Sequence, residues 1–172
     1  MHISDNKAII KANKLVKKFG TRNADRLAEE LGVIVKPINF KNQKGVYKVI
    51  ERNRFIFIKE ALDPIMHNIV LLHELGHDSL YRKNAITTGG FQEFNIFNMQ
   101  NNWMEYEANL FAAQISLPDD ELLEYITMGY DVAQIASAMY SDINLVALKI
   151  SELNNQGYRF KQQYYNNRFL ML

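Results

Sequence analysis

Residues 64–77 form the stretch that most constrains the fold of this chain. Asp63 and Pro64 suit the N-cap and the first position of a helix. The run from Ile69 to Leu72 then makes this helix apolar nearly all round. We therefore expect the helix to lie in the core of the protein and not on its surface.

The same helix carries an H-E-x-x-H motif, from His73 to His77. At 3.6 residues per turn, the two histidines lie on one face, where a single metal ion can reach both imidazole rings. Glu74 is rotated about 100° from His73, so it can reach a water on that metal more easily than the metal itself. A surface helix with two unrelated histidines is the alternative, and the apolar flanks disfavour it. Two buried histidines need partners, and a shared metal is the simplest one.

Gly76 lies inside this predicted helix, where glycine costs about 1 kcal/mol relative to alanine. A close approach of another backbone element would compensate for that cost. The glycine therefore predicts that a second element crosses the helix next to the two histidines.

A catalytic zinc needs a third protein ligand and an open position for water. The chain has no cysteine, so the ligand must be His, Asp or Glu. Glu105 and Glu107 are the candidates, and being two residues apart on a helix they cannot both face the metal. Glu105 is preferred because it shares its face with the small residue Ala108 and with Asn109, which could hydrogen-bond a ligand histidine. Glu107 stays open as the alternative.

The remaining pattern predicts a mainly helical α+β domain with a small, antiparallel-containing sheet of about three strands. Residues 1–172 are expected to form one domain, with a helix pair at 131–153 and an aromatic tail at 157–172 as its C-terminal extension. Helices are predicted at 6–19, 21–32, 64–82, 103–117, 131–140 and 142–153, together with one that runs through Ile126 after a loop and cap at 118–121. Strands are predicted at 33–35, 45–50 and 55–58, with turns at 37–42 and 51–54.

A long connection runs from about Lys83 to Asn102, and it contains Gly89-Gly90, five asparagines and several large apolar residues. Loops of this length in a compact domain are usually functional or mobile. Two interpretations stay open: a substrate-facing lid, or simple ordered packing.

Charge and hydropathy exclude several classes of protein. The net charge of +1 disfavours a general affinity for nucleic acid or for anionic membranes. The longest apolar run is four residues, too short for a membrane span, and the first residues do not resemble a signal peptide. We therefore predict a cytoplasmic protein with no membrane partner; its oligomeric state is left open.

The helix pair at 131–153 has the apolar rhythm of a helix-turn-helix. A DNA-reading helix needs basic or amide side chains, and its second helix offers only Lys149, with Asp142 and Glu152 against it. Structural packing is favoured, so no direct contact with nucleic acid is expected. A DNA-binding helix pair is the alternative.

The combination of HELGH, a connection of 27 residues and then EYEANLFAAQISLP resembles the ImmA/IrrE metallopeptidase family. The stretch at 19–32 also resembles the N-terminal helices of that family, so the likeness covers about residues 10–153. The ending from Gln114 to Pro118 departs from the more apolar, leucine-rich family pattern. The resemblance implies a zincin-like fold with Zn²⁺ bound by His73, His77 and Glu105, and with Glu74 as the catalytic glutamate.

The resemblance also implies a function. Members of the family are expected to be cytoplasmic zinc-dependent endopeptidases that cleave a helix-turn-helix repressor of a phage, a mobile element or a stress regulon. Glu74 would activate the attacking water. The alternative is a non-proteolytic anti-repressor that binds its partner by contact alone and uses zinc only as a structural ion.

Overall fold

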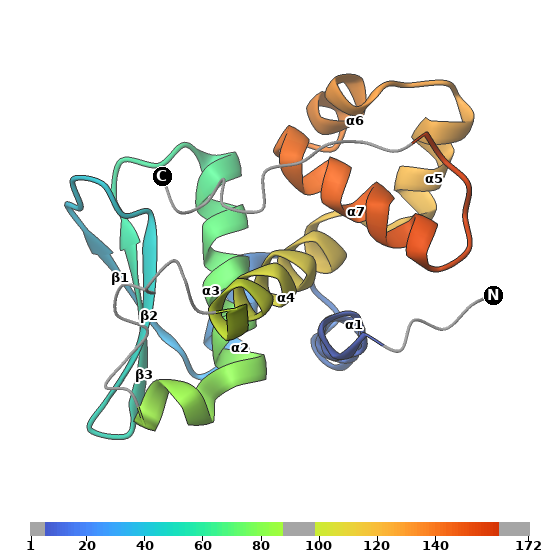
Figure 1. Cartoon of the computed structure of the whole chain (residues 1–172). Helices are drawn as coiled ribbons and strands as arrows, with labels where there is room; N and C mark the ends of the chain where they lie inside the picture. The colour runs from blue at the N-terminus through green and yellow to red at the C-terminus, as the bar shows by residue number, and fades with distance from the viewer. Residues whose placement is uncertain (1–5, 88–98, 162–172) are drawn as a thin grey trace.

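A computed structural model describes residues 6–87 and 99–161 of the chain, shown in Figure 1. A helical pair opens the chain, a small sheet follows, and the remaining elements are helical. In chain order they are α1 (Lys7–Phe19), α2 (Ala24–Leu31), β1 (Ile34–Ile38), β2 (Gly45–Ile50), β3 (Asn53–Lys59), α3 (Pro64–Thr87), α4 (Met99–Ser116), α5 (Asp119–Thr127), α6 (Val132–Ala138) and α7 (Ile143–Asn155). The predicted α+β class is confirmed.

The sheet has the strand order β1-β3-β2. β1 runs parallel to β3, with Ile34 opposite Phe55, and β2 runs antiparallel to β3, with Tyr47 opposite Ile56. The predicted sheet of about three strands with an antiparallel pair is therefore confirmed. Both β1 and β2 are edge strands, and β2 is the one that packs closely on α3.

Two predicted turns differ from the structure, one in its position and one in its length. The turn expected at 37–42 begins later, because β1 continues through Pro37 to Ile38. Proline has no N–H to donate, and an edge strand tolerates it when that nitrogen faces away from the sheet. The turn expected at 51–54 is only Glu51 and Arg52, both with positive φ of 49° and 68°. Two such residues match the right-handed twist of a tight hairpin.

Helix α3 begins as predicted, since the Asp63 side chain accepts from the backbone N–H of Met66 at 2.9 Å. It continues to Thr87, beyond the expected end near Lys83, after a kink at Tyr81 where φ is −131° and ψ is 19°. Ala85 is buried in this added turn, which explains why the helix continues past the kink.

Helix α4 begins at Met99, four residues before the predicted start at Trp103, so the connection between the two helices is shorter than the sequence suggested. Residues 88–98 of this connection lie outside the described residues. The structure therefore does not decide between the lid interpretation and ordered packing. Helix α4 ends at Ser116, in agreement with the predicted stop at Pro118. Pro118 is the N-cap of α5, which begins at Asp119 and so includes most of the predicted loop and cap.

Helix α3 lies between the sheet on one side and α4 on the other (Figure 1). The two helices touch at Gly76, where an added Cβ would lie 3.1 Å from the Cα of Ala108 and 3.3 Å from its carbonyl oxygen. The close approach predicted from Gly76 is confirmed. This contact brings the histidine face of α3 directly against α4.

Helices α5, α6 and α7 lie on the far side of α4 from the sheet (Figure 1). Lys149 of α7 is only 1 % exposed and donates to Gln114 of α4 and to Asp119 of α5. Burial lowers the pKa of Lys149, and Asp119 opposes that effect. Because the one basic residue of the second predicted helix is buried, it is not available to contact DNA, which supports the packing interpretation.

The contact at Gly76 yields a stability prediction. Gly76→Val places two methyl groups against the backbone of α4, and overpacking of this kind costs about 1–3 kcal/mol. Urea unfolding should therefore show a lower midpoint with an unchanged slope. Lys17→Val, at an exposed position of α1, is the control for β-branching alone. A midpoint for Gly76→Val equal to that of the control would show that the helices do not touch there.

Candidate metal centre

The three residues expected to bind metal lie together between α3 and α4. Nε2 of His73 lies 3.2 Å from Oε2 of Glu105, and Nε2 of His77 lies 3.2 Å from Oε1 of the same carboxylate. The two Nε2 atoms are 3.1 Å apart. All three side chains are buried, so three ligand-type atoms point at one small volume from which most water is excluded.

Asn109 orients the first histidine. Its Oδ1 lies 2.8 Å from Nδ1 of His73, and a carbonyl oxygen can only accept, so the Nδ1–H donates. A neutral His73 with its proton on Nδ1 presents the lone pair of Nε2 toward His77 and Glu105. The sequence predicted this partner from its position one turn after Glu105.

Glu105 and His73 each shift the pKa of the other toward its charged form. Burial alone would raise the pKa of Glu105, but the neighbouring imidazoles of His77 and His73 hold that pKa well below its ordinary value. Burial opposes protonation of His73, yet the hydrogen bond and the charge of Glu105 raise its pKa overall. The site therefore contains a stable carboxylate and stabilises positive charge beside it.

Glu107 faces away from this cluster. Its side chain is buried against α1, where Oε2 lies 2.9 Å from Nζ of Lys7. The rotation of about 200° between residues two apart on a helix accounts for the difference. Of the two glutamates considered from the sequence, Glu105 is the one beside the histidines.

Glu74 occupies a different face of α3, next to strand β2. Its carboxylate is buried, and burial raises the pKa of Glu74, as does the charge of Glu105. The charges of His73 and His77 and a backbone hydrogen bond from Tyr47 act in the opposite direction. A carboxyl group with a raised pKa is suited to accepting and returning a proton near neutral pH.

The donor set fits a zinc ion. Two imidazoles and one carboxylate are the ligands of many catalytic zinc sites, which leave a fourth position open. Ligand atoms about 2.0–2.1 Å from a tetrahedral ion lie roughly 3.3–3.4 Å from one another. The observed separations of 3.1–3.2 Å are close to that value. Within the residues described, no other group of three His, Cys, Asp or Glu side chains comes together in this way.

Sequence reasoning missed three residues around Glu74. Gly45 and Tyr47 of β2 contact the glutamate, and Asp78, which is buried, binds the Tyr47 hydroxyl. A signal for Asp78 was present, because an acidic residue one turn after Glu74 on a buried helix needs a partner. The two strand residues carried no comparable signal.

No helix in the described ranges 6–87 and 99–161 is both long and apolar enough to cross a membrane.

Comparison with known proteins shows the family of this chain. A model of a peptidase family, described as the IrrE N-terminal-like domain, matches residues 28–139, which include Glu74, both histidines and Glu105. Over 151 residues the chain is 33 % identical to "Uncharacterized immunity region protein 2" of Bacillus phage phi105, covering 86 % of this chain and 93 % of that protein. The resemblance seen in the sequence is thus confirmed: the chain belongs to the IrrE N-terminal-like family of metallopeptidases.

Proposed function

We propose that this protein is a zinc-dependent endopeptidase that cleaves a helix-turn-helix repressor in the cytoplasm. The observation that carries the proposal is the buried group of His73, His77 and Glu105, with Glu74 on the adjacent face of the same helix. Membership of a metallopeptidase family supports the reaction class. A relative named as a phage immunity region protein supports a repressor as the substrate.

His73 and His77 would hold the ion through Nε2, and Glu105 would hold it through its carboxylate. A zinc ion there supplies Lewis acidity, which polarises a peptide carbonyl and makes water a nucleophile at neutral pH. Asn109 keeps the His73 ring in the orientation and tautomer that binding requires. A structural site has no use for a carboxylate such as Glu74, which favours catalysis over a purely structural ion.

Glu74 performs the proton transfers. As water attacks the carbonyl carbon, Glu74 takes the water proton and passes it to the amine nitrogen that leaves. Burial of Glu74 keeps other water away from its carboxylate. Its raised pKa brings its proton affinity closer to that of the attacking water and the leaving amine, between which it carries the proton.

Glu74→Gln tests the proteolytic proposal. It keeps the shape of the side chain but cannot accept a proton, so cleavage of the repressor encoded beside this gene should fall about 10²–10⁴-fold. The zinc content should stay the same, since the ligands are intact. Cleavage is measured by electrophoresis of purified proteins and zinc by elemental analysis.

Glu107→Gln is the matched control, because it makes the same change at a buried glutamate that faces α1. It should cleave at the wild-type rate. If Glu74→Gln still relieves repression as well as the wild type does, the protein acts by contact alone and the proteolytic proposal is wrong.

Glu105→Gln tests the third ligand. Removing a residue that only hydrogen-bonds to a zinc ligand lowers zinc affinity about 10–100-fold. Removing the negative charge of a ligand itself should therefore lower zinc affinity by more than about 100-fold. Competition with a chromophoric chelator measures the zinc dissociation constant. Glu107→Gln should bind zinc as the wild type does, and the reverse ranking of the two variants would assign the ligand to Glu107.

A further inference from the structure

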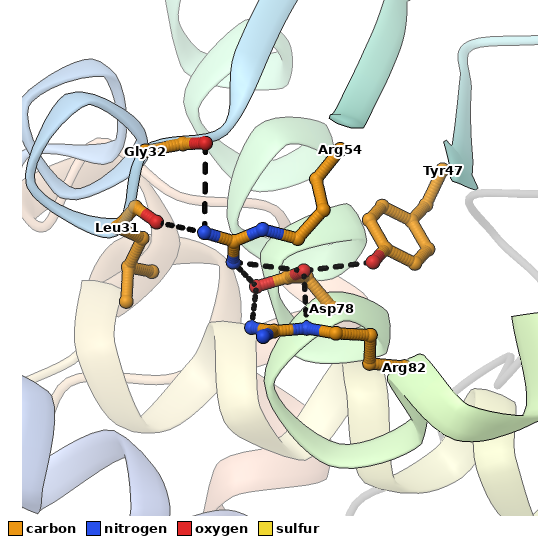
Figure 2. Close-up of polar contacts among 6 residues, drawn as sticks. All are labelled: Leu31, Gly32, Tyr47, Arg54, Asp78 and Arg82. Atoms are coloured by element: carbon orange, nitrogen blue, oxygen red, sulfur yellow. Dashed lines mark hydrogen bonds and ion pairs between the residues drawn. The ribbon is translucent and has the colours of Figure 1, made fainter. Parts of the chain in front are cut away.

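A buried carboxylate lies one turn beyond the catalytic motif. Asp78 accepts from the Tyr47 hydroxyl at 2.8 Å, from Arg54 Nη1 at 2.9 Å and from Arg82 Nη2 at 3.1 Å, as Figure 2 shows. Arg54 also donates to the carbonyl of Leu31 at the end of α2. Asp78 therefore links α3 to both strands of the hairpin and, through Arg54, to α2.

The Tyr47 side chain is fully buried on the face of β2 that meets α3. Burial, together with the hydrogen bond to Asp78, raises the pKa of its hydroxyl, so the hydroxyl stays protonated and donates. The arginines neutralise Asp78, but Tyr47 is the partner that comes from β2. This hydrogen bond thus sets where the strand lies along the helix.

The backbone of Tyr47 points toward Glu74. Lys59 donates to the carbonyl of Lys44 at 2.8 Å, so this pair is a hydrogen-bonded pair of the hairpin. Hydrogen-bonded and non-bonded pairs alternate along an antiparallel ladder, so Tyr47, three residues later, is in a non-bonded pair and its N–H faces away from β3. That N–H donates to the Glu74 carboxylate.

Gly45 completes the contact from the same strand. An added Cβ there would lie 2.8 Å from Oε1 of Glu74 and 2.7 Å from Cγ1 of Val70. The strand can approach the helix at this point only because the residue has no side chain. Val70, Glu74 and Asp78 are four residues apart and form the stripe of α3 that β2 covers.

We infer that Asp78 and Tyr47 are positioning residues, which hold strand β2 so that its backbone fixes the Glu74 carboxylate beside the metal ligands. The inference rests on the proposed function, because it assigns Glu74 the role of water activation. Asp78 holds the Tyr47 hydroxyl, Tyr47 presents its backbone N–H, and Glu74 accepts it. Both residues act through Glu74, Tyr47 directly and Asp78 through Tyr47.

A purely structural ion cluster is the competing explanation for Asp78. It would account for the two arginines, and its loss would lower stability alone. It does not account for the second contact of Tyr47, through its N–H, with Glu74. The two explanations therefore differ in whether removing one hydroxyl alters the surroundings of Glu74.

Tyr47→Phe is the test, because it removes that hydroxyl and leaves both arginines on Asp78. Hydrogen exchange of the residue 47 amide, measured by NMR on the zinc-loaded protein, should become at least about tenfold faster. For cleavage of the co-encoded repressor, kcat should fall at least about tenfold, with KM and zinc affinity unchanged, since small displacements of a catalytic group are costly. Gly45→Ala, which pushes on the carboxylate directly, should also lower kcat without loss of zinc.

Tyr106→Phe is the matched control. The Tyr106 hydroxyl donates to the carboxylate of Glu152 at 3.2 Å, which ties α4 to α7 far from β2. This control should leave both the residue 47 amide and kcat as in the wild type. If the residue 47 amide of Tyr47→Phe exchanges as slowly as in the wild type, the inference is wrong. This outcome counts even if the wild-type protein proves not to cleave a repressor. Faster exchange with an unchanged kcat would leave the geometry intact but disprove the catalytic role.

Discussion

The close crossing of α3 and α4 at Gly76 and Ala108 is the constraint on which the rest of the structure depends. The backbone atoms of the two helices come so near that a single methyl group would be crowded. At that spacing, side chains within one turn of the crossing on either helix meet at hydrogen-bond distance, which is how Glu105 and Asn109 reach the histidines. A wider crossing would leave buried imidazoles and a buried carboxylate without partners, at a considerable cost.

Helix α3 separates two tasks by using two faces. The face with His73 and His77 meets another helix, and the face with Glu74 and Asp78 meets an edge strand. The side chains proposed to bind the metal are thus held by helix–helix packing, whereas the glutamate proposed to carry the proton is held by the backbone of a strand. Because the two supports come from different elements, the position of Glu74 can be disturbed while the ligand triangle stays intact.

Much of this arrangement could be predicted from the sequence, because it follows from spacing along single helices. The four-residue separation of His73 and His77 and the burial of their helix required nothing beyond helical geometry. The contacts of Asp78 could not be predicted, because Tyr47 and Arg54 lie 31 and 24 residues away and meet it only once the hairpin docks. The sequence also placed Pro37 in a turn, whereas it lies in strand β1. A strand accepts proline there only because β1 is at the edge of the sheet, and the strand order is not visible in the sequence.

The side chain of Gln114 joins α4 to both α1 and α7. It accepts from Lys149 and donates to Asn13, while Arg22 holds the carbonyls of Gln114 and Ile115. Helix α4 is thus clamped about 13–14 Å along its axis from Glu105. Lys149 is buried where it meets Gln114, so loss of either side chain would leave the other without this contact inside the protein. The C-terminal helices therefore brace the helix that carries Glu105 and Asn109.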